Sequence, residues 1–237
     1  MHFVGVDGCR AGWVALALSE DGAPSHLVAP TIADVALRYP VALALVDVPI
    51  GLRGHERQER LCDIEARARL GPRRASVFAP PCRSALGQTS YEAASAENLR
   101  CTGRKLSKQS FHIAPRIRDV EEYLRRSSSS GPVIREMHPE ICFWALAGRP
   151  MARAKRTEMG ETERLDVLSA HLPAARAIVA EVTAAHPRSA VGPDDVIDAL
   201  AGAVTGLVGV LRLRTLPERP ERDARNLRME IVYARPV

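Results

Sequence analysis

The chain has 237 residues, of which 46% are hydrophobic, and its formal net charge is +5. This length and composition suit one domain with a substantial core. No stretch approaches the roughly 18 uninterrupted apolar residues of a membrane span, and no basic N-terminal region precedes an apolar signal core. We therefore expect a cytoplasmic protein without a membrane partner, organised as a single domain over residues 1–237.

The cysteines exclude two further classes of protein. They are odd in number, scattered and without any C-x-x-C pair: Cys9, Cys62, Cys82, Cys101 and Cys142. This pattern predicts neither a disulfide framework nor a zinc site. The positive charge is compatible with a polyanionic partner, but it is diluted along the whole chain.

The N-terminal residues predict a β-hairpin followed by a helix and a buried strand. Two β-type runs, 2–7 and 13–19, flank a turn bounded by glycines. A short strand at 26–29 and a helix at 31–39 follow. Residues 41–46 are apolar throughout, as in a strand covered on both faces, and Asp47 follows them directly.

Residues 53–130 have a different character from the rest of the chain. They are rich in Arg, Gln, Ser and Pro, with helices expected at 57–70 and 115–124 and a flexible serine run at 127–130. We expect a large, mostly helical or irregular insertion after the fourth strand. Its basic side chains predict either a phosphate-binding groove or solvated charge: Arg73, Arg74, Arg83, Arg100, Arg104, Lys105 and Lys108.

The C-terminal half alternates between strand and helix patterns. A strand at 132–136, a short helix at 141–146, a helical pattern at 162–182 interrupted by Pro173, an apolar helix at 196–211 and an edge strand at 229–233 are expected. Strands and helices in this order predict an α/β fold, in which a mixed sheet is flanked by helices.

The apolar helix carries a carboxylate that needs a cation. No face of the run 196–211 is left for water, so this helix should pack in a core. Asp198 lies inside it, and a buried ionised carboxylate is costly unless something pairs with it. Asp195 lies on the same helical face. Asp194 and Asp195 also suit the first turn, where the helix dipole favours acids.

Two more acids end buried strands. Asp7 closes the first strand, where it is a candidate metal ligand or a cap of its own turn, and Asp47 closes the fourth. Carboxylates in three buried elements predict one shared ion. Oxygen ligands without cysteine or a histidine set favour Mg²⁺ or Mn²⁺, and such a cluster suits hydrolysis of a phosphodiester.

Five ordered motifs extend over nearly the whole chain: GVDGCRAGW at 5–13, DVPIGL at 47–52, RASVF at 74–78, EMHPE at 136–140 and DDVIDAL at 194–200. With them the sequence resembles domain-of-unknown-function family 429, whose members are regarded as predicted nucleases of the ribonuclease H-like superfamily. The last helix is similar to that of the Holliday-junction resolvases. The resemblance implies a ribonuclease H-like fold with Asp7, Asp47, Asp195 and Asp198 as the metal ligands.

Two features depart from the resolvase pattern: Asp47 is followed by Pro49, and Glu136 and His138 are extra polar residues. Glu136 is a candidate additional ligand at the end of a strand. His138 is a candidate proton shuttle, or a histidine that bonds a loop carbonyl. Arg10, beside Asp7, is placed either to contact a phosphate or to pair with an acid.

The leading functional hypothesis is therefore a Mg²⁺- or Mn²⁺-dependent nuclease that acts on DNA or RNA. One alternative is a nucleotide-binding protein of the actin-like or sugar-kinase type, with ATP phosphates held by the glycine-bounded hairpin. Another is a non-catalytic metal-binding interaction protein. The sequence does not indicate an oligomeric state, although homodimers are common among soluble proteins.

Overall fold

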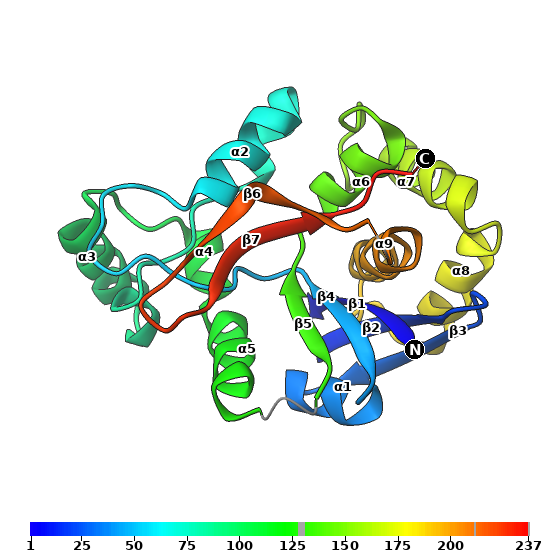
Figure 1. The fold of residues 1–237 in the computed structure, drawn as a ribbon, viewed down its shortest axis with the longest axis horizontal. Coiled ribbons are helices and arrows are strands. Elements are labelled where there is room, and N and C mark those ends of the chain that lie inside the picture. Colours follow the sequence, from blue (N-terminus) through cyan, green and yellow to red (C-terminus); the bar gives the residue numbers. More distant parts are fainter. Residues whose placement is uncertain (128–130, 211, 237) are drawn as a thin grey trace.

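The computed structural model describes residues 1–127, 131–210 and 212–236. Its centre is a five-stranded mixed sheet of order β3-β2-β1-β4-β5 (Figure 1). β2 runs antiparallel to β1 and β3, whereas β1, β4 and β5 are parallel. The strands are His2–Cys9 (β1), Gly12–Ser19 (β2), Pro24–Ala29 (β3), Ala42–Val46 (β4) and Val133–Glu136 (β5). The expected α/β architecture is confirmed at this level.

Side chains of β1 and β4 alternate between two hydrophobic clusters, because successive residues of a strand point to opposite faces. Phe3 and Leu43 belong to the cluster on one face. Val4 and Val46 belong to the cluster on the other face. Both faces of the sheet are therefore covered, which explains why residues 42–46 are all apolar.

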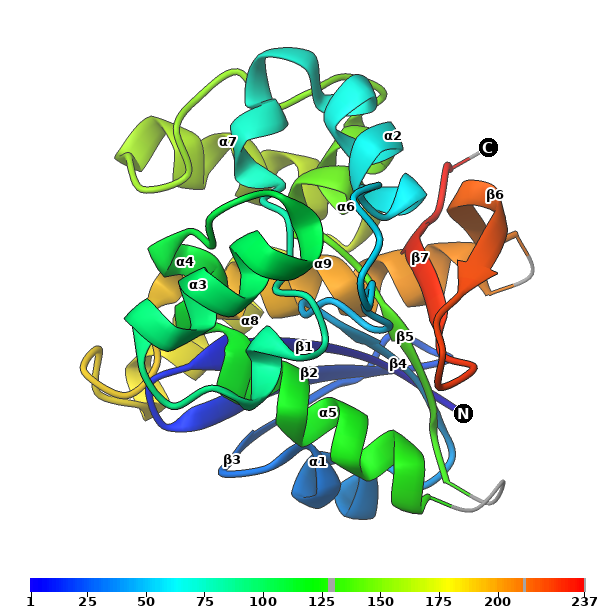
Figure 2. The same ribbon diagram turned by 90° about the vertical axis from the view of Figure 1, so that its left-hand side faces the viewer.

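Helices cover the two faces unequally (Figures 1 and 2). Helices α1 and α5 contribute to one cluster, and α6, α7, α8 and α9 contribute to the other. No helix in the described ranges combines the length and apolarity needed to cross a bilayer. The bounds are Ile32–Arg38 (α1), Ala114–Arg126 (α5), Pro139–Ala147 (α6), Glu158–His171 (α7), Ala175–Ala185 (α8) and Pro193–Gly209 (α9).

A glycine lets α9 lie directly on β1. A Cβ atom at Gly5 would stand 1.8 Å from the carbonyl oxygen of Ala199 and 2.4 Å from the backbone nitrogen of Ala203. Gly202 meets the strand at the same place, because its added Cβ would lie 2.9 Å from the Cα of Gly5. This contact between backbones sets the position of Asp198, the residue before Ala199, over the sheet.

The segment between β4 and β5 contains most of the structure outside the sheet layers. It includes Leu61–Leu70 (α2), Tyr91–Thr102 (α3), Lys108–His112 (α4) and the 3-10 turns Gly71–Ser76 and Ala85–Gly87. Helix α5 returns to the sheet, where Asp119 accepts hydrogen bonds from Trp13 Nε1 (2.7 Å) and the Ile32 N–H (2.8 Å). Of the serine run predicted to be flexible, 128–130 lie outside the described residues, as does Leu211 at the end of the predicted last helix.

The C-terminal residues form a separate antiparallel pair, Arg214–Arg222 (β6) and Arg228–Tyr233 (β7). The strand predicted at 229–233 exists and pairs with β6. It also touches the edge of the main sheet, because Val232 makes an isolated parallel bridge with Met137, the residue after β5. Sequence analysis missed β6 because it contains Pro217 and Pro220, and proline argues against a strand. A register shift between Leu216 and Glu221 accommodates both prolines.

Candidate metal centre

The strand register brings Asp7 and Asp47 to the same edge of the sheet. Val6 pairs with Val46 in the parallel ladder, and the Asp47 N–H donates to the Val6 carbonyl at 2.8 Å. Asp7 is the next residue of β1, and Asp47 directly follows β4. Because parallel strands end together, the two carboxylates leave the sheet side by side.

Asp198 completes the group from above the sheet. It lies in α9 and its residue is 2% exposed, whereas Asp7 is 8% exposed. One carboxylate oxygen from each of Asp7, Asp47 and Asp198 lies within 4.8 Å of the other two. Three oxygen ligands from three separate elements are thus close enough to bind one hard divalent cation.

Asp195 has a different role in the structure from Asp198. Its Oδ2 accepts a hydrogen bond from the Gly192 N–H at 3.0 Å, so that it caps the first turn of α9. It is not in the group of three carboxylates, although it is half-buried on the same helix. Asp194 lies 3.8 Å from Lys155 and 3.6 Å from Arg156. The preference of acids for a helix start therefore accounts for the hydrogen bond made by Asp195.

Burial and mutual repulsion make the three carboxylates hard to ionise. Burial, followed by the charges of Asp47 and Asp198, raises the pKa of Asp7 well above its usual value. Burial raises the pKa of Asp47 to about 6 and that of Asp198 to about 7, while the ammonium group of Lys155 opposes both shifts. Oδ1 of Asp198 is buried without a hydrogen-bond partner among the described residues. A positive charge beside these oxygens favours their ionised form.

Lys155 supplies part of that charge and was missed by sequence analysis. Its Nζ contacts Oδ2 of Asp198, and its side chain is 33% exposed. Burial lowers the pKa of Lys155, but Asp198 and Asp7 raise it by more, so the ammonium form is favoured. The residue lies in the polar segment between α6 and α7, which shows no periodicity. The one available signal is its rarity, since the chain holds three lysines among 33 basic residues.

The carboxylates lie in a cavity of about 430 Å³. Besides Lys155, three arginines line it: Arg60, Arg73 and Arg116. Two of them have a buried nitrogen without a hydrogen-bond partner in the described part of the chain, Nη2 of Arg73 and Nε of Arg116. A second nitrogen of each of these two arginines is anchored, because Nε of Arg73 donates to the Met151 carbonyl (3.0 Å) and Nη2 of Arg116 donates to the Cys9 carbonyl. The cavity is therefore lined both by the three carboxylates and by cationic side chains.

His138 lines the same cavity and bonds a loop carbonyl, which was one of the two predicted readings. Its Nε2 lies 3.3 Å from the Ser76 carbonyl oxygen, so Nε2 carries the proton in that contact. Nδ1 is then an acceptor, and it is buried without a partner among the residues described. Burial lowers the pKa of His138, which favours the neutral ring.

Glu136 binds a buried arginine and does not belong to the group of three aspartates. Arg60, 2% exposed, donates to both oxygens of Glu136 (2.6 and 2.9 Å) and to both oxygens of Asp63 (2.7 and 2.9 Å). The same guanidinium donates to the carbonyls of Ile50 (3.2 Å) and Gly51 (3.1 Å). Glu136 and Asp63 are close enough to Cys62 to hold an ion in principle, but Arg60 already provides the positive charge there.

Arg60 marks the start of α2, and this differs from the predicted helix boundary. Arg10 is not part of the site. Helix α2 begins at Leu61 rather than at residue 57, because Arg60 has an extended backbone (ψ 134°) that turns its side chain inward. Arg10 is exposed, and no ion pair of Arg10 is present within the described ranges. The structure thus brings Asp7, Asp47, Asp198 and His138 to one cavity, with Glu136 held at its edge by Arg60.

One known protein family matches most of the chain. The model of the family described as a protein of unknown function, DUF429, matches residues 5–222. The chain belongs to this family. The DUF429 match contains all three converging aspartates, the cavity arginines and β6, whereas β7 follows it. Comparisons with curated proteins and with solved structures find no match.

Proposed function

We propose that the protein is a metal-dependent phosphodiester hydrolase, a nuclease of ribonuclease H-like fold. The observation that carries the proposal is the convergence of Asp7, Asp47 and Asp198 at a cavity whose walls hold cationic side chains. An acidic centre suits a divalent ion, and surrounding cations suit a phosphodiester that approaches it. A structural ion site would need the carboxylates but not the cations.

The order of elements supports the fold assignment. A hairpin whose first strand carries Asp7, a helix, a parallel strand followed by Asp47, and a late helix with Asp198 are the features of the superfamily resemblance. Within that framework residues from about 53 to 130 form an insertion, and its last helix, α5, helps to cover the sheet. We therefore expect substrate specificity to lie in this insertion.

The donor set fits Mg²⁺ or Mn²⁺. Three carboxylates without a thiolate favour a hard ion, and the unpartnered Oδ1 of Asp198 is a ready ligand atom. Asp7, Asp47 and Asp198 would hold the ion, and Asp195 would join them only by giving up its bond to the Gly192 N–H. Bound there, such an ion supplies activation of the attacking water and stabilisation of the charge on the leaving oxygen.

The remaining side chains have distinct roles in this proposal. Arg73 and Arg116 direct their free N–H groups to the phosphate oxygens and so orient the diester. Lys155 balances the carboxylates and keeps them close together before an ion binds. His138 is neutral and its Nδ1 has no hydrogen-bond partner among the described residues, so Nδ1 would accept a proton from the attacking water.

The hairpin argues against the nucleotide-binding alternative. A Cβ at Gly8 would lie 2.0 Å from Nε of Arg116, so the arginine side chain already fills the space over the glycine-bounded turn. ATP phosphates would have to displace it. A non-catalytic metal-binding protein would retain the ion site without turnover, and that alternative is decided by assay.

The test is cleavage of a panel of labelled DNA and RNA, single-stranded, double-stranded and branched, with Mn²⁺, Mg²⁺ or a chelator. The wild type is compared with Asp198→Asn and with Asp166→Asn, a matched change at an aspartate whose side chain is 66% exposed. We expect metal-dependent cleavage that is abolished by Asp198→Asn and retained by Asp166→Asn. Cleavage by Asp198→Asn at the wild-type rate, or none by a folded wild type on any substrate, would refute the proposal.

A further inference from the structure

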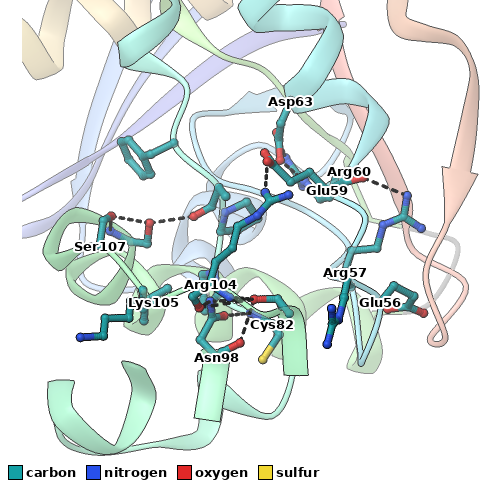
Figure 3. A pocket seen from close by; sticks show the side chains of 18 of the residues that line it. Glu56, Arg57, Glu59, Arg60, Asp63, Cys82, Asn98, Arg104, Lys105 and Ser107 are labelled. Carbon is teal, nitrogen blue, oxygen red and sulfur yellow. Dashed lines mark hydrogen bonds and ion pairs between the residues drawn. The ribbon is translucent and has the colours of Figure 1, made fainter. Parts of the chain in front are cut away.

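A second cavity, of about 140 Å³ (Figure 3), shares lining residues with the cavity of the three aspartates. It lies between residues 53–60, the segment 78–82 and the region joining α3 to α4. Arg60, Asp63 and Phe78 line both this cavity and that of the aspartates. The two cavities thus share a wall, in which Arg60 and Asp63 are buried and Phe78 is partly exposed to solvent.

The wall of the second cavity is built before any ligand arrives. Oδ1 of Asn98 accepts from the Cys82 N–H at 2.8 Å, and its Nδ2 donates to the Arg104 carbonyl at 2.8 Å. The hydroxyl of Ser110, which is fully buried, donates to the Ala79 carbonyl at 2.7 Å. These bonds fix a lining that is mainly apolar, formed by Phe78, Ala79, Pro80, Pro81, Cys82 and Leu106. Preformed apolar cavities with a few polar groups are typical ligand sites.

The charged residues of the lining favour a negatively charged ligand. Five basic residues face three acidic ones in it: Arg53, Arg57, Arg60, Arg104 and Lys105 against Glu56, Glu59 and Asp63. Arg104 is paired with Glu59, and Arg60 with Asp63. Arg57 and Lys105 are exposed and make no ion pair within the described ranges. Two cations thus remain available beside an apolar cavity.

Phe78 is placed for stacking rather than for packing in the core. It is 37% exposed, although the preceding Val77 is buried in the cluster beneath β6 and β7 and so anchors the backbone. Exposed aromatic rings at a junction between a phosphate site and an apolar cavity are platforms on which an unpaired base stacks. A cavity of about 150 Å³ holds a benzene-sized ring, so the available volume suits a single ring.

We propose that the second cavity binds one unpaired nucleobase of the substrate strand, next to the nucleotide whose phosphate lies at the aspartates. Phe78 stacks on this base, and Arg57 and Lys105 bind the phosphate that follows it. The proposal takes its ligand class from the proposed nuclease function and makes that function specific for strands with an unpaired base beside the cleaved bond.

The first experiment measures binding of a fluorescent oligothymidine and of the same strand with one abasic position, moved along its length. Every protein carries Asp198→Asn, so that the strands stay intact. We expect one abasic position to weaken binding roughly tenfold, the loss of one base stack. Phe78→Ala should remove this dependence on position, and Phe78→Tyr should retain it. A dependence unchanged in Phe78→Ala, or absent from the beginning, overturns the proposal.

The second experiment tests the cations with a matched control. The double variant Arg57→Ala/Lys105→Ala should weaken binding of every strand and lower the slope of log affinity against log salt by about 0.7, the value for one phosphate contact on a single strand. Arg126→Ala/Arg176→Ala removes the same charge from exposed ion pairs that do not line the cavity. Equal slopes for the two double variants would contradict the assignment.

The two proposals fail separately. Metal-dependent cleavage together with an abasic dependence that Phe78→Ala leaves unchanged would retain the nuclease and exclude the base site. An abasic dependence that Phe78→Ala removes, without cleavage by the wild type, would retain the base site on a protein that binds strands and does not cut them.

Discussion

Asp198→Asn should stabilise the metal-free protein, although it removes an ion pair. Asp198 is buried beside Asp7 and Asp47, and Lys155 is the cation that contacts it. Asparagine keeps the shape of the side chain and removes the charge. Lys155 retains its ion pair with Asp194, whose Oδ2 lies 3.8 Å from Nζ, so the variant does not leave an isolated ammonium group.

The magnitude follows from the shift in the pKa of Asp198. Burial raises this pKa to about 7, against about 3.9 for an unperturbed aspartate. Ionising the group in the folded state above pH 7 therefore costs about 4 kcal/mol relative to the unfolded chain. The folded state holds the proton more tightly, so the cost is absent below pH ~4, grows as the pH rises, and is complete above pH ~7.

The assay is urea unfolding in chelator at about pH 5 and about pH 8. We expect the free energy of unfolding of Asp198→Asn to exceed that of the wild type by about 2–4 kcal/mol at the higher pH. The difference should be smaller at the lower pH. Asp166→Asn, on the surface, should match the wild type at both. Mn²⁺ at a hundredfold excess over its dissociation constant should then stabilise the wild type by about 2.7 kcal/mol and the variant by much less. A variant that is less stable than the wild type at about pH 8 in chelator would refute this reasoning.

Three further outcomes are expected. Lys155→Met should raise the affinity for Mn²⁺, measured by calorimetry, because the ammonium group no longer competes for Asp198; an unchanged affinity would mean that ion and lysine coexist. Gly5→Ala should destabilise the protein by at least about 3 kcal/mol in urea and weaken Mn²⁺ binding, whereas Gly87→Ala, which meets nothing within 4 Å, should do neither. Arg60→Ala should cost about 3–5 kcal/mol of unfolding free energy, since it strands two buried carboxylates, and a loss below about 1 kcal/mol, typical of a surface pair, would contradict that.

The converging aspartates were predictable because each one violates the apolar pattern of its own segment. Asp7 and Asp47 end runs that are otherwise buried, and Asp198 interrupts an apolar helix. Polar groups in such positions are costly, which makes them informative. Asp195 gave a weaker signal, since an acid at a helix start has a structural explanation in its bond to the Gly192 N–H.

The cationic residues of the site were harder to predict, for a physical reason. Lys155 and Arg73 lie in segments without periodicity, and their positions depend on tertiary contacts such as that of Arg73 with the Met151 carbonyl. Arg60 interrupts a helical pattern only because its guanidinium satisfies carboxylates contributed by α2 and β5. Local sequence does not encode such partners.

The missed elements follow the same rule. Helix α3 buries Ala94, Ser95, Asn98 and Cys101, so its sequence carries no apolar stripe. Strand β6 contains two prolines and is retained by its pairing with β7 and by burial of Leu216. Both elements are stabilised by tertiary contacts more than by their local pattern. The sheet and the helices that cover it had strong patterns and were predicted.

The two halves of the site therefore differ in how they are constrained. The spacing between Asp7 and Asp198 depends on the glycine contact between β1 and α9, so any change in that core packing moves a carboxylate. The second cavity is lined entirely by residues between β4 and β5, and the hydrogen bonds of Asn98 and Ser110 that order its wall are internal to that segment. Arg53 and Arg60 connect the wall to Glu221 of β6 and Glu136 of β5. Under the proposed function, substitutions in this segment would change which strand is bound and would leave the three aspartates in place. The base-site and Gly5 experiments together test this proposed division, in which the core fixes the metal centre and residues 53–110 recognise the strand.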